Sequence, residues 1–314
     1  MFTIAKTLAF PTLPLLVGLS FASVSLAQDD AAEWGSITPS HVYQLTDQII
    51  EEIDILRDAI GVLDIPIDPE PQSARTPTHT YVKALEVMEK ISRAERKLGM
   101  APVEVEQLPI KVIIPEDVLN FSQSILVELQ KIKDQLAISD ESEEPRFVGG
   151  KTANDVYENL WIASYLLDGI VGSPLTPDDV SRTLDYIIED LNLISTKMQV
   201  TLQLDPPEVK GRKRPKEVTQ QGLLSLYKTI NLQTRLGMDP SNVPNVLLIR
   251  VTPSDTYDIA NTLLAELMRI KLELEINLPH EIRRLPTGRR ANDTFAQMRL
   301  IGMNLDQLLR GASS

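Results

Sequence analysis

The chain has 314 residues, with 31 lysines and arginines against 44 aspartates and glutamates, no cysteine and three histidines. Without thiols there can be no disulfide, no cysteine-based zinc site, no covalent haem attachment and no cysteine nucleophile. The net charge of −13 argues against nucleic acid as a partner, because the phosphate groups would be repelled.

Residues 1–27 have the pattern of a secretory signal peptide. Lys6 is the only charge in this segment, an apolar stretch runs over 8–22, and Ser25-Leu26-Ala27 supplies small residues before a cleavage point. An uncleaved membrane anchor is the alternative, but two prolines interrupt the stretch, which is shorter than the ~20 residues of a span. We expect the mature chain to have no transmembrane segment and no lipid anchor. A secreted protein without cysteine fits the bacterial periplasm or exterior best.

After the signal peptide, one helix start is repeated eight times. Its anchor position, proline in most copies, is taken by Pro39, Pro77, Pro115 and Ala153 in a first series and by Pro177, Pro215, Pro253 and Ala291 in a second. Successive anchors within a series are 38 residues apart, and adding 138 maps the first series onto the second. This period predicts a tandem duplication, with one unit at 28–172 and the other at 173–314.

Each copy predicts one amphipathic helix. Threonine before proline is a good N-cap, proline is tolerated at the first helical position, and an acidic residue two places later can bond back to the cap and favours the helix dipole. Apolar residues follow in a heptad-like rhythm, which predicts core-facing helices of about 20–24 residues. The sixth copy is the weakest, because Gly222, Ser225 and Thr229 fall on its core stripe. The expected fold is therefore all-α, with two four-helix repeat units in a bundle or a solenoid-like array.

The connectors leave the direction of the helices open. Most are rich in proline and about 14 residues long, which exceeds the usual length in helical bundles. Extended, they reach ~46 Å, whereas a 22-residue helix is ~33 Å long. Each connector can therefore run back along its helix and make consecutive helices parallel, or the helices alternate up and down with loose loops. The short connector at 172–175 predicts an antiparallel hairpin between the fourth and fifth helices.

No catalytic or cofactor template is present. The chain lacks the nucleophile elbow, the glycine-rich dinucleotide and phosphate loops and the zinc-protease motif, of which His280-Glu281 is only half. His41 and His79 stand where other copies have an acidic residue, so helix capping is the expected role. A metal site there would need neighbouring helix starts and a nearby carboxylate. We predict no catalytic residue, no metal and no cofactor.

One repeat position is enriched in aromatic residues. Four residues after the anchor stand Tyr43, Tyr81, Tyr157, Tyr257 and Phe295. If the helix starts share an end, these rings could form a groove that stacks on a glycan, a peptide or an apolar ligand. The alternative, which we favour, is that each ring packs under the preceding connector as a hydrophobic staple.

Basic residues gather in two stretches of the second unit. They are Lys210, Arg212, Lys213 and Arg214, and Arg283, Arg284, Arg289 and Arg290. On an acidic protein such a patch could bind an anionic headgroup, a polysaccharide or an acidic partner. Exposed, solvated connectors are the simpler interpretation.

Three functions remain open on this evidence. The first is an exported, non-enzymatic binding or scaffold protein of the bacterial envelope whose partner is a protein or another envelope component. The second is a periplasmic carrier or sensor of a small apolar or aromatic ligand, which predicts a continuous apolar cavity within one unit. The third is a carboxylate-based hydrolase of an envelope polymer, which predicts two carboxylates facing each other at a cleft. The oligomeric state cannot be predicted.

Overall fold

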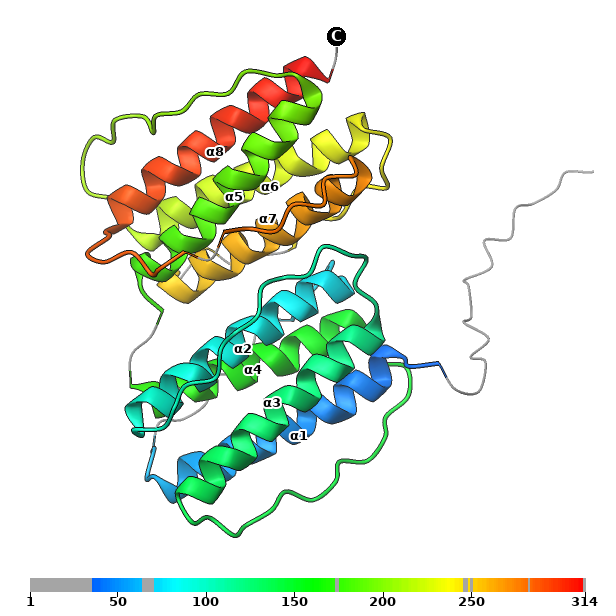
Figure 1. Cartoon of the computed structure of the whole chain (residues 1–314), viewed down its shortest axis with the longest axis vertical. Coiled ribbons are helices and arrows are strands. Elements are labelled where there is room, and N and C mark those ends of the chain that lie inside the picture. Colours follow the sequence, from blue (N-terminus) through cyan, green and yellow to red (C-terminus); the bar gives the residue numbers. More distant parts are fainter. Residues whose placement is uncertain are drawn as a thin grey trace, which may run out of the picture. The chain divides into compact units, whose positions relative to one another are not determined.

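The computed structural model describes residues 36–63, 71–172, 175–244, 248, 251–281 and 283–312. The predicted signal peptide lies outside these residues. Residues Ile37–Ser314 form one compact unit. In the described part of the chain every regular element is a helix (Figure 1): α1 (Pro39–Ala59), α2 (Pro77–Lys97), α3 (Pro115–Gln135), α4 (Ala153–Val171), α5 (Pro177–Met198), α6 (Pro215–Arg235), α7 (Pro253–Glu273) and α8 (Ala291–Gly311). The prediction of an all-α fold with eight helices is confirmed.

Each helix begins on its anchor residue for the expected reason. In all eight, the side chain at the third helical position accepts a hydrogen bond from the backbone N–H of the N-cap residue. His41 and His79 fill this role through Nδ1, 3.1 Å from the N–H of Thr38 and Thr76 respectively. The capping role predicted for the two histidines is therefore confirmed, and it satisfies donors that the first turn leaves unpaired.

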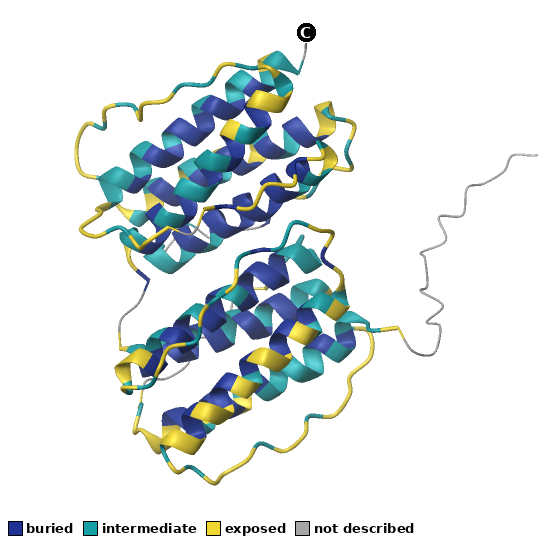
Figure 2. Cartoon of the chain, viewed as in Figure 1, coloured by how far each residue is buried: buried dark blue, intermediate teal, exposed yellow. Residues whose placement is uncertain are grey.

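The helices pack as two four-helix bundles of identical connectivity. In the first bundle α1 and α2 each contact α3 and α4, while α1 and α2 do not contact each other. In the second bundle α5 and α6 contact α7 and α8 in the same way. Buried apolar side chains form the core of each bundle, and Figure 2 shows that every helix contains buried residues. The domain boundaries at 28–172 and 173–314 stay a prediction, since residues 28–35 and 173–174 lie outside the described part.

All four helices of a bundle run in the same direction, because the contacts along neighbouring helix pairs follow ascending order in both helices of each pair. Along the α1–α4 pair, Lys151 N donates to Ser40 Oγ at the starts (3.1 Å), Asn159 to Thr46 further along (3.2 Å), and Arg57 to the Leu166 carbonyl towards the ends (2.7 Å). Such an ascending order of contacts occurs only between parallel helices. Several connectors run back along the outside of the bundles (Figure 1), so the parallel alternative is the correct one.

The predicted hairpin between the fourth and fifth helices is wrong. Helices α4 and α5 make no contact with each other, and the two bundles meet instead through α2 and α7. A short connector brings two helix ends together, but it produces a hairpin only when the apolar stripes face each other. Here each stripe is already buried in its own bundle.

Candidate functional site

The contact between α2 and α7 forms a polar seam between the bundles. Lys83 and Glu86 on α2 are both buried, and the Lys83 ammonium binds Asp258 of α7 and lies 2.8 Å from the Glu86 carboxylate. The two carboxylates raise the pKa of Lys83 against the opposing effect of its burial. Because buried charges are stable only when paired, this cluster holds the two helices in one register.

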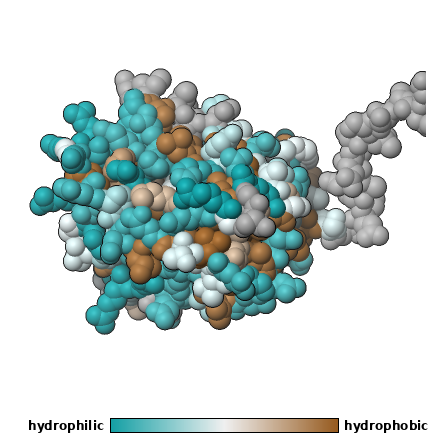
Figure 3. Space-filling view, turned by 90° about the horizontal axis from the view of Figure 1, so that it is seen from above, coloured by the Kyte–Doolittle hydropathy of each residue, from teal (hydrophilic) through white to brown (hydrophobic). Residues whose placement is uncertain are grey.

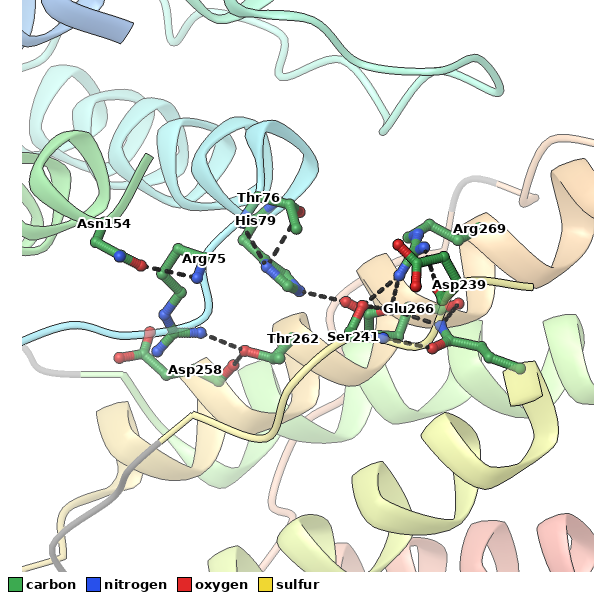
Figure 4. Close-up of polar contacts among 11 residues, drawn as sticks. Arg75, Thr76, His79, Asn154, Asp239, Ser241, Asp258, Thr262, Glu266 and Arg269 are labelled. Atoms are coloured by element: carbon green, nitrogen blue, oxygen red, sulfur yellow. Dashed lines mark hydrogen bonds and ion pairs between the residues drawn. The ribbon is translucent and has the colours of Figure 1, made fainter. Parts of the chain in front are cut away.

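A histidine bridges the seam further along (Figure 4). His79 Nδ1 accepts the cap bond on α2, and Nε2 lies 2.9 Å from the Glu266 carboxylate of α7. A neutral imidazole satisfies both contacts, and burial lowers the pKa of His79. Burial alone would raise the pKa of Glu266, but hydrogen bonds from His79, Ser241 and Gln233 lower it to about 2. In this bridge a neutral His79 faces an ionised Glu266, and protein groups take the place of water around the carboxylate.

A cavity of about 440 Å³ lies beside the seam, lined by α2, α5, α7 and two connectors. Its lining combines an apolar part with arginines and aromatic rings: Val82, Leu85, Val103, Val105, Leu108, Leu264 and Leu285; Arg93, Arg96, Arg182 and Arg283; Tyr186, Tyr257 and His280. This volume and mixed composition are typical of small-molecule sites. A wider hollow of about 660 Å³ lies where the start of α2 meets the end of α7, but its lining includes no aromatic ring.

Most charged groups on the cavity lining are already paired. Glu89 accepts from Arg182 at 2.6 Å and from the Tyr257 hydroxyl at 3.2 Å, and Arg93 binds Asp179. These pairs fix the positions of the side chains, so the walls are preorganised. Burial and the Glu89 carboxylate raise the pKa of Tyr257, which keeps its hydroxyl protonated.

The same lining also includes hydrogen-bonding amides and a hydroxyl. Among the described residues of this lining, Gln107 Nε2 is buried without a partner, and the Thr183 hydroxyl and the Asn261 amide belong to buried residues that line the cavity. Arg96 has no carboxylate partner within the described chain. Buried polar groups without partners are unfavourable, and a bound molecule with hydrogen-bonding atoms would satisfy them.

The aromatic residues of the repeat do not gather into one groove. A cationic side chain from a connector covers three of them: Lys151 lies over Tyr43, Arg75 over Tyr157 and Lys213 over Phe295. Tyr81 packs against Phe121, 5.0 Å between ring centroids. Of the five, Tyr257 lines the cavity.

The two basic stretches come together at the start of α8. Lys213 N donates to Asn292 Oδ1 at 2.8 Å, and Asn292 in turn donates to the Gly211 carbonyl, which places 211–213 beside Arg289 and Arg290. The other predicted residues of this patch, Lys210, Arg212, Arg214, Arg283 and Arg284, are exposed on the connectors. Arg283 pairs with Glu189 at 2.8 Å and also lines the cavity.

One pair of carboxyl groups lies at a cleft. Glu95 of α2 and Glu128 of α3 are neighbours, and burial together with the nearby Glu128 carboxylate raises the pKa of Glu95. They line a cleft of about 460 Å³ with Lys131. The residues 138 positions later are Gln233 and Glu266, whose side chains are 2.6 Å apart, so this is a structural contact of the repeat in which Glu95 takes the place of an amide.

No metal centre is evident in the described part of the chain, where no group of three or more histidine, aspartate or glutamate side chains is suited to hold an ion. His280, from the incomplete zinc motif, instead lies 2.8 Å from Asp190 and stacks on Tyr186. His41 and His79 are not brought together either, since each caps its own helix.

Sequence reasoning missed the residues that build the cavity. Arg93, Arg182, Gln107, Thr183 and Asn261 come from distant repeats, and each resembles a residue of an ordinary solvated face. The one available signal lay in the duplication: the outer positions of α2 are strongly charged, whereas the copy of this face on α6 carries Leu224 and Tyr227.

A comparison with protein-family models, with curated proteins and with solved structures found no match to this chain. In the described residues no helix is both long and apolar enough to cross a membrane.

Proposed function

We propose that this protein is a non-enzymatic binding protein that holds a small ligand in the cavity at the seam. The observation that carries the proposal is the cavity itself, about 440 Å³ lined from both bundles. An apolar wall beside the unpaired Gln107 amide and the exposed Arg96 guanidinium favours a ligand with an apolar or aromatic body and a hydrogen-bonding, acidic edge.

The interior of a single bundle is a less suitable place for a ligand. In the first bundle, an apolar void of about 10 Å³ lies between the helix ends, which is at the lower limit for one water molecule. The sequence-based hypothesis of a small-ligand carrier predicted an apolar cavity inside one four-helix unit. The proposal therefore moves the ligand to the seam, where docking of two bundles leaves space.

Export to the bacterial periplasm or exterior remains part of the proposal, and its support is the pattern of residues 1–27. The meeting of the basic stretches near Asn292 supports an anionic envelope component as the partner of that end. We therefore propose that the ligand-bound protein contacts the envelope through this basic end.

A direct test uses the fluorescent probe 8-anilinonaphthalene-1-sulfonate, which has an aromatic body and an acidic edge. We expect saturable binding with one site per chain. Asn261→Trp fills the cavity and should weaken binding at least tenfold, whereas Gln123→Trp, at the exposed equivalent position of α3, should leave it unchanged.

Leu285→Trp provides a second variant at a half-exposed position of the same lining, where loss of folding is not expected. Circular dichroism verifies the helical content of each variant. Absence of saturable binding, or equal binding by all three variants, contradicts the proposal.

A hydrolase of an envelope polymer is the second candidate, favoured by one observation, the Glu95–Glu128 pair at its cleft. Two carboxyl groups with one raised pKa can act as acid and base. Release of reducing ends from purified cell-wall polymer, abolished by Glu128→Gln, would support it. No release by the wild-type protein would contradict it.

A further inference from the structure

The seam joins two unlike faces of a duplicated unit. Helix α2 of the first bundle packs on α7 of the second, but the copy of α2 is α6, and the copy of α7 is α3. Such a heterologous contact leaves one copy of each face unused. Accordingly, within the described chain, α6 and α3 contact only helices of their own bundles.

Burial shows that these two faces are open. Asn261, Thr262 and Ala265 of α7 are buried, whereas the equivalent Gln123, Ser124 and Val127 of α3 are exposed. On α6, the positions equivalent to Glu86 and Glu89 are occupied by Leu224 and Tyr227, which are 57% and 59% exposed.

These open faces carry large apolar side chains at the centre of the repeated interface. Val127 is 54% exposed at the position of the fully buried Ala265. On the face in Figure 3 apolar residues lie in patches among hydrophilic ones. Exposed apolar residues that coincide with an interface position indicate a binding surface.

Two polar pairs of the seam are replaced by neutral residues on both open faces. The seam pair Lys83–Asp258 is replaced by Gln221 on α6 and Asn120 on α3, which is a neutral amide pair. Similarly, Glu89 with Tyr257 becomes Tyr227 with Leu119. If only one of the two faces had a neutral residue at such a position, the contact would bury an unpaired charge on the other face. Because both faces have neutral residues there, they remain complementary.

We propose that the open α6 face of one copy of this chain docks on the open α3 face of a second copy, repeating the geometry of the internal seam and producing a head-to-tail array. The occupant is a second copy, because it carries the matching face. One contact is unfavourable: Glu217 would meet Glu128 where His79 meets Glu266. Lys131, 2.8 Å from Glu128, supplies the compensating positive charge. The proposal is independent of the ligand site.

Sedimentation velocity over increasing protein concentration tests the array. The wild-type protein should associate beyond the dimer, since each added copy exposes a fresh face. Leu224→Glu blocks the α6 face and Val127→Glu blocks the α3 face, and each variant alone should stay monomeric, with an apparent Kd raised at least tenfold. Leu204→Glu, at an exposed apolar position on neither face, is the matched control and should associate like the wild type.

Mixing the two blocked variants distinguishes this contact from other modes of association. Leu224→Glu retains an intact α3 face and Val127→Glu retains an intact α6 face, so the equimolar mixture should form a heterodimer and nothing larger. A monomeric wild type at high concentration overturns the proposal. So does a Val127→Glu variant that associates normally, which would indicate a symmetric contact through α6.

Discussion

Buried ion pairs recur at the same repeat positions in both bundles. Glu52 pairs with Lys133 at 2.6 Å, and 138 residues later Asp190 pairs with Lys271, also at 2.6 Å. A third group completes each pair: the Ser142 hydroxyl on Glu52 and its equivalent His280 on Asp190. These contacts link a helix to the connector that lies on it, so they position the connectors as well as the helices.

Loss of one partner from the fully buried pair should be costly. Lys271→Met leaves the Asp190 carboxylate without its cation, and we expect a loss of about 3–5 kcal/mol in the free energy of unfolding. Urea denaturation measures the change. Adding Asp190→Leu should recover most of the loss, because an apolar pair tolerates burial.

The matched control is Lys228→Met, which removes a half-exposed partner of Asp306. Solvent screens that pair, and we expect a loss below about 1 kcal/mol. Equal losses for Lys228→Met and Lys271→Met would contradict this account of the buried pair.

The raised pKa of Glu95 predicts a pH dependence of the stability. Burial and the Glu128 carboxyl raise the pKa of Glu95 above its ordinary 4.5. Its contribution to stability is therefore fully present below pH 4.5 and is lost as the pH rises through the folded-state pKa. Glu95→Gln replaces the carboxyl by an amide that can donate to Glu128, as Gln233 donates to Glu266, and should stabilise the protein at neutral pH by about 1 kcal/mol.

The measurement is the thermal midpoint across pH 4 to 8, and the second bundle supplies the reciprocal control. Gln233→Glu places a carboxyl beside Glu266, from which Gln233 is now 2.6 Å away, and it should introduce the same loss with rising pH. If Glu95→Gln leaves the pH profile of the wild type unchanged, a raised pKa of Glu95 is not the cause of that profile.

At the scale of single helices, α6 shows why a weak apolar pattern can still form a core helix. Gly222, Ser225 and Thr229 are buried, and a Cβ atom added to Gly222 would lie 2.5 Å from Ile259 Cγ2 of α7. The small residues therefore let α6 and α7 approach closely. The weak apolar pattern of this helix in the sequence therefore marks a close contact between α6 and α7.

Gly222→Ala should thus be destabilising although alanine is the better helix former. Alanine contributes about 1 kcal/mol of helix propensity, whereas overpacking costs about 1–3 kcal/mol, and we expect a net loss of roughly 1 kcal/mol by chemical denaturation. In Gly302→Ala the nearest atom is the flexible Gln221 amide at 3.0 Å. That control should be neutral or stabilising; if Gly222→Ala also stabilises, the close approach is not required.

The helices themselves were predictable, because their signals are local. The cap, the proline and the apolar rhythm lie within one turn or one face, and all eight helices begin on the anchor residues. Direction was not predictable, since a connector of this length permits both arrangements. The hairpin prediction failed because connector length says nothing about which apolar faces are still free.

At the scale of the whole molecule, the candidate site arises from docking rather than from any one repeat. Its residues extend from Val82 to Leu285, and no periodicity connects them. Lys83 and Glu86 of α2 are buried, yet in the sequence they have the pattern of a solvent-exposed helix face. A polar interface and a solvent-exposed surface contain the same residue types. Only the unequal charge of α2 and its copy α6 distinguished them.

The parallel arrangement also has a consequence for how quickly the chain can fold. Consecutive helices α1 and α2 do not touch, and the contacting pair closest in sequence within the first bundle, α2 with α3, has starts 38 residues apart. No helical hairpin can form early, so every contact must wait for closure of a long loop. We expect stopped-flow refolding in milliseconds to seconds, as for β-proteins, and not the microseconds of ordinary helical bundles. A microsecond phase that recovers the full native signal would contradict this expectation.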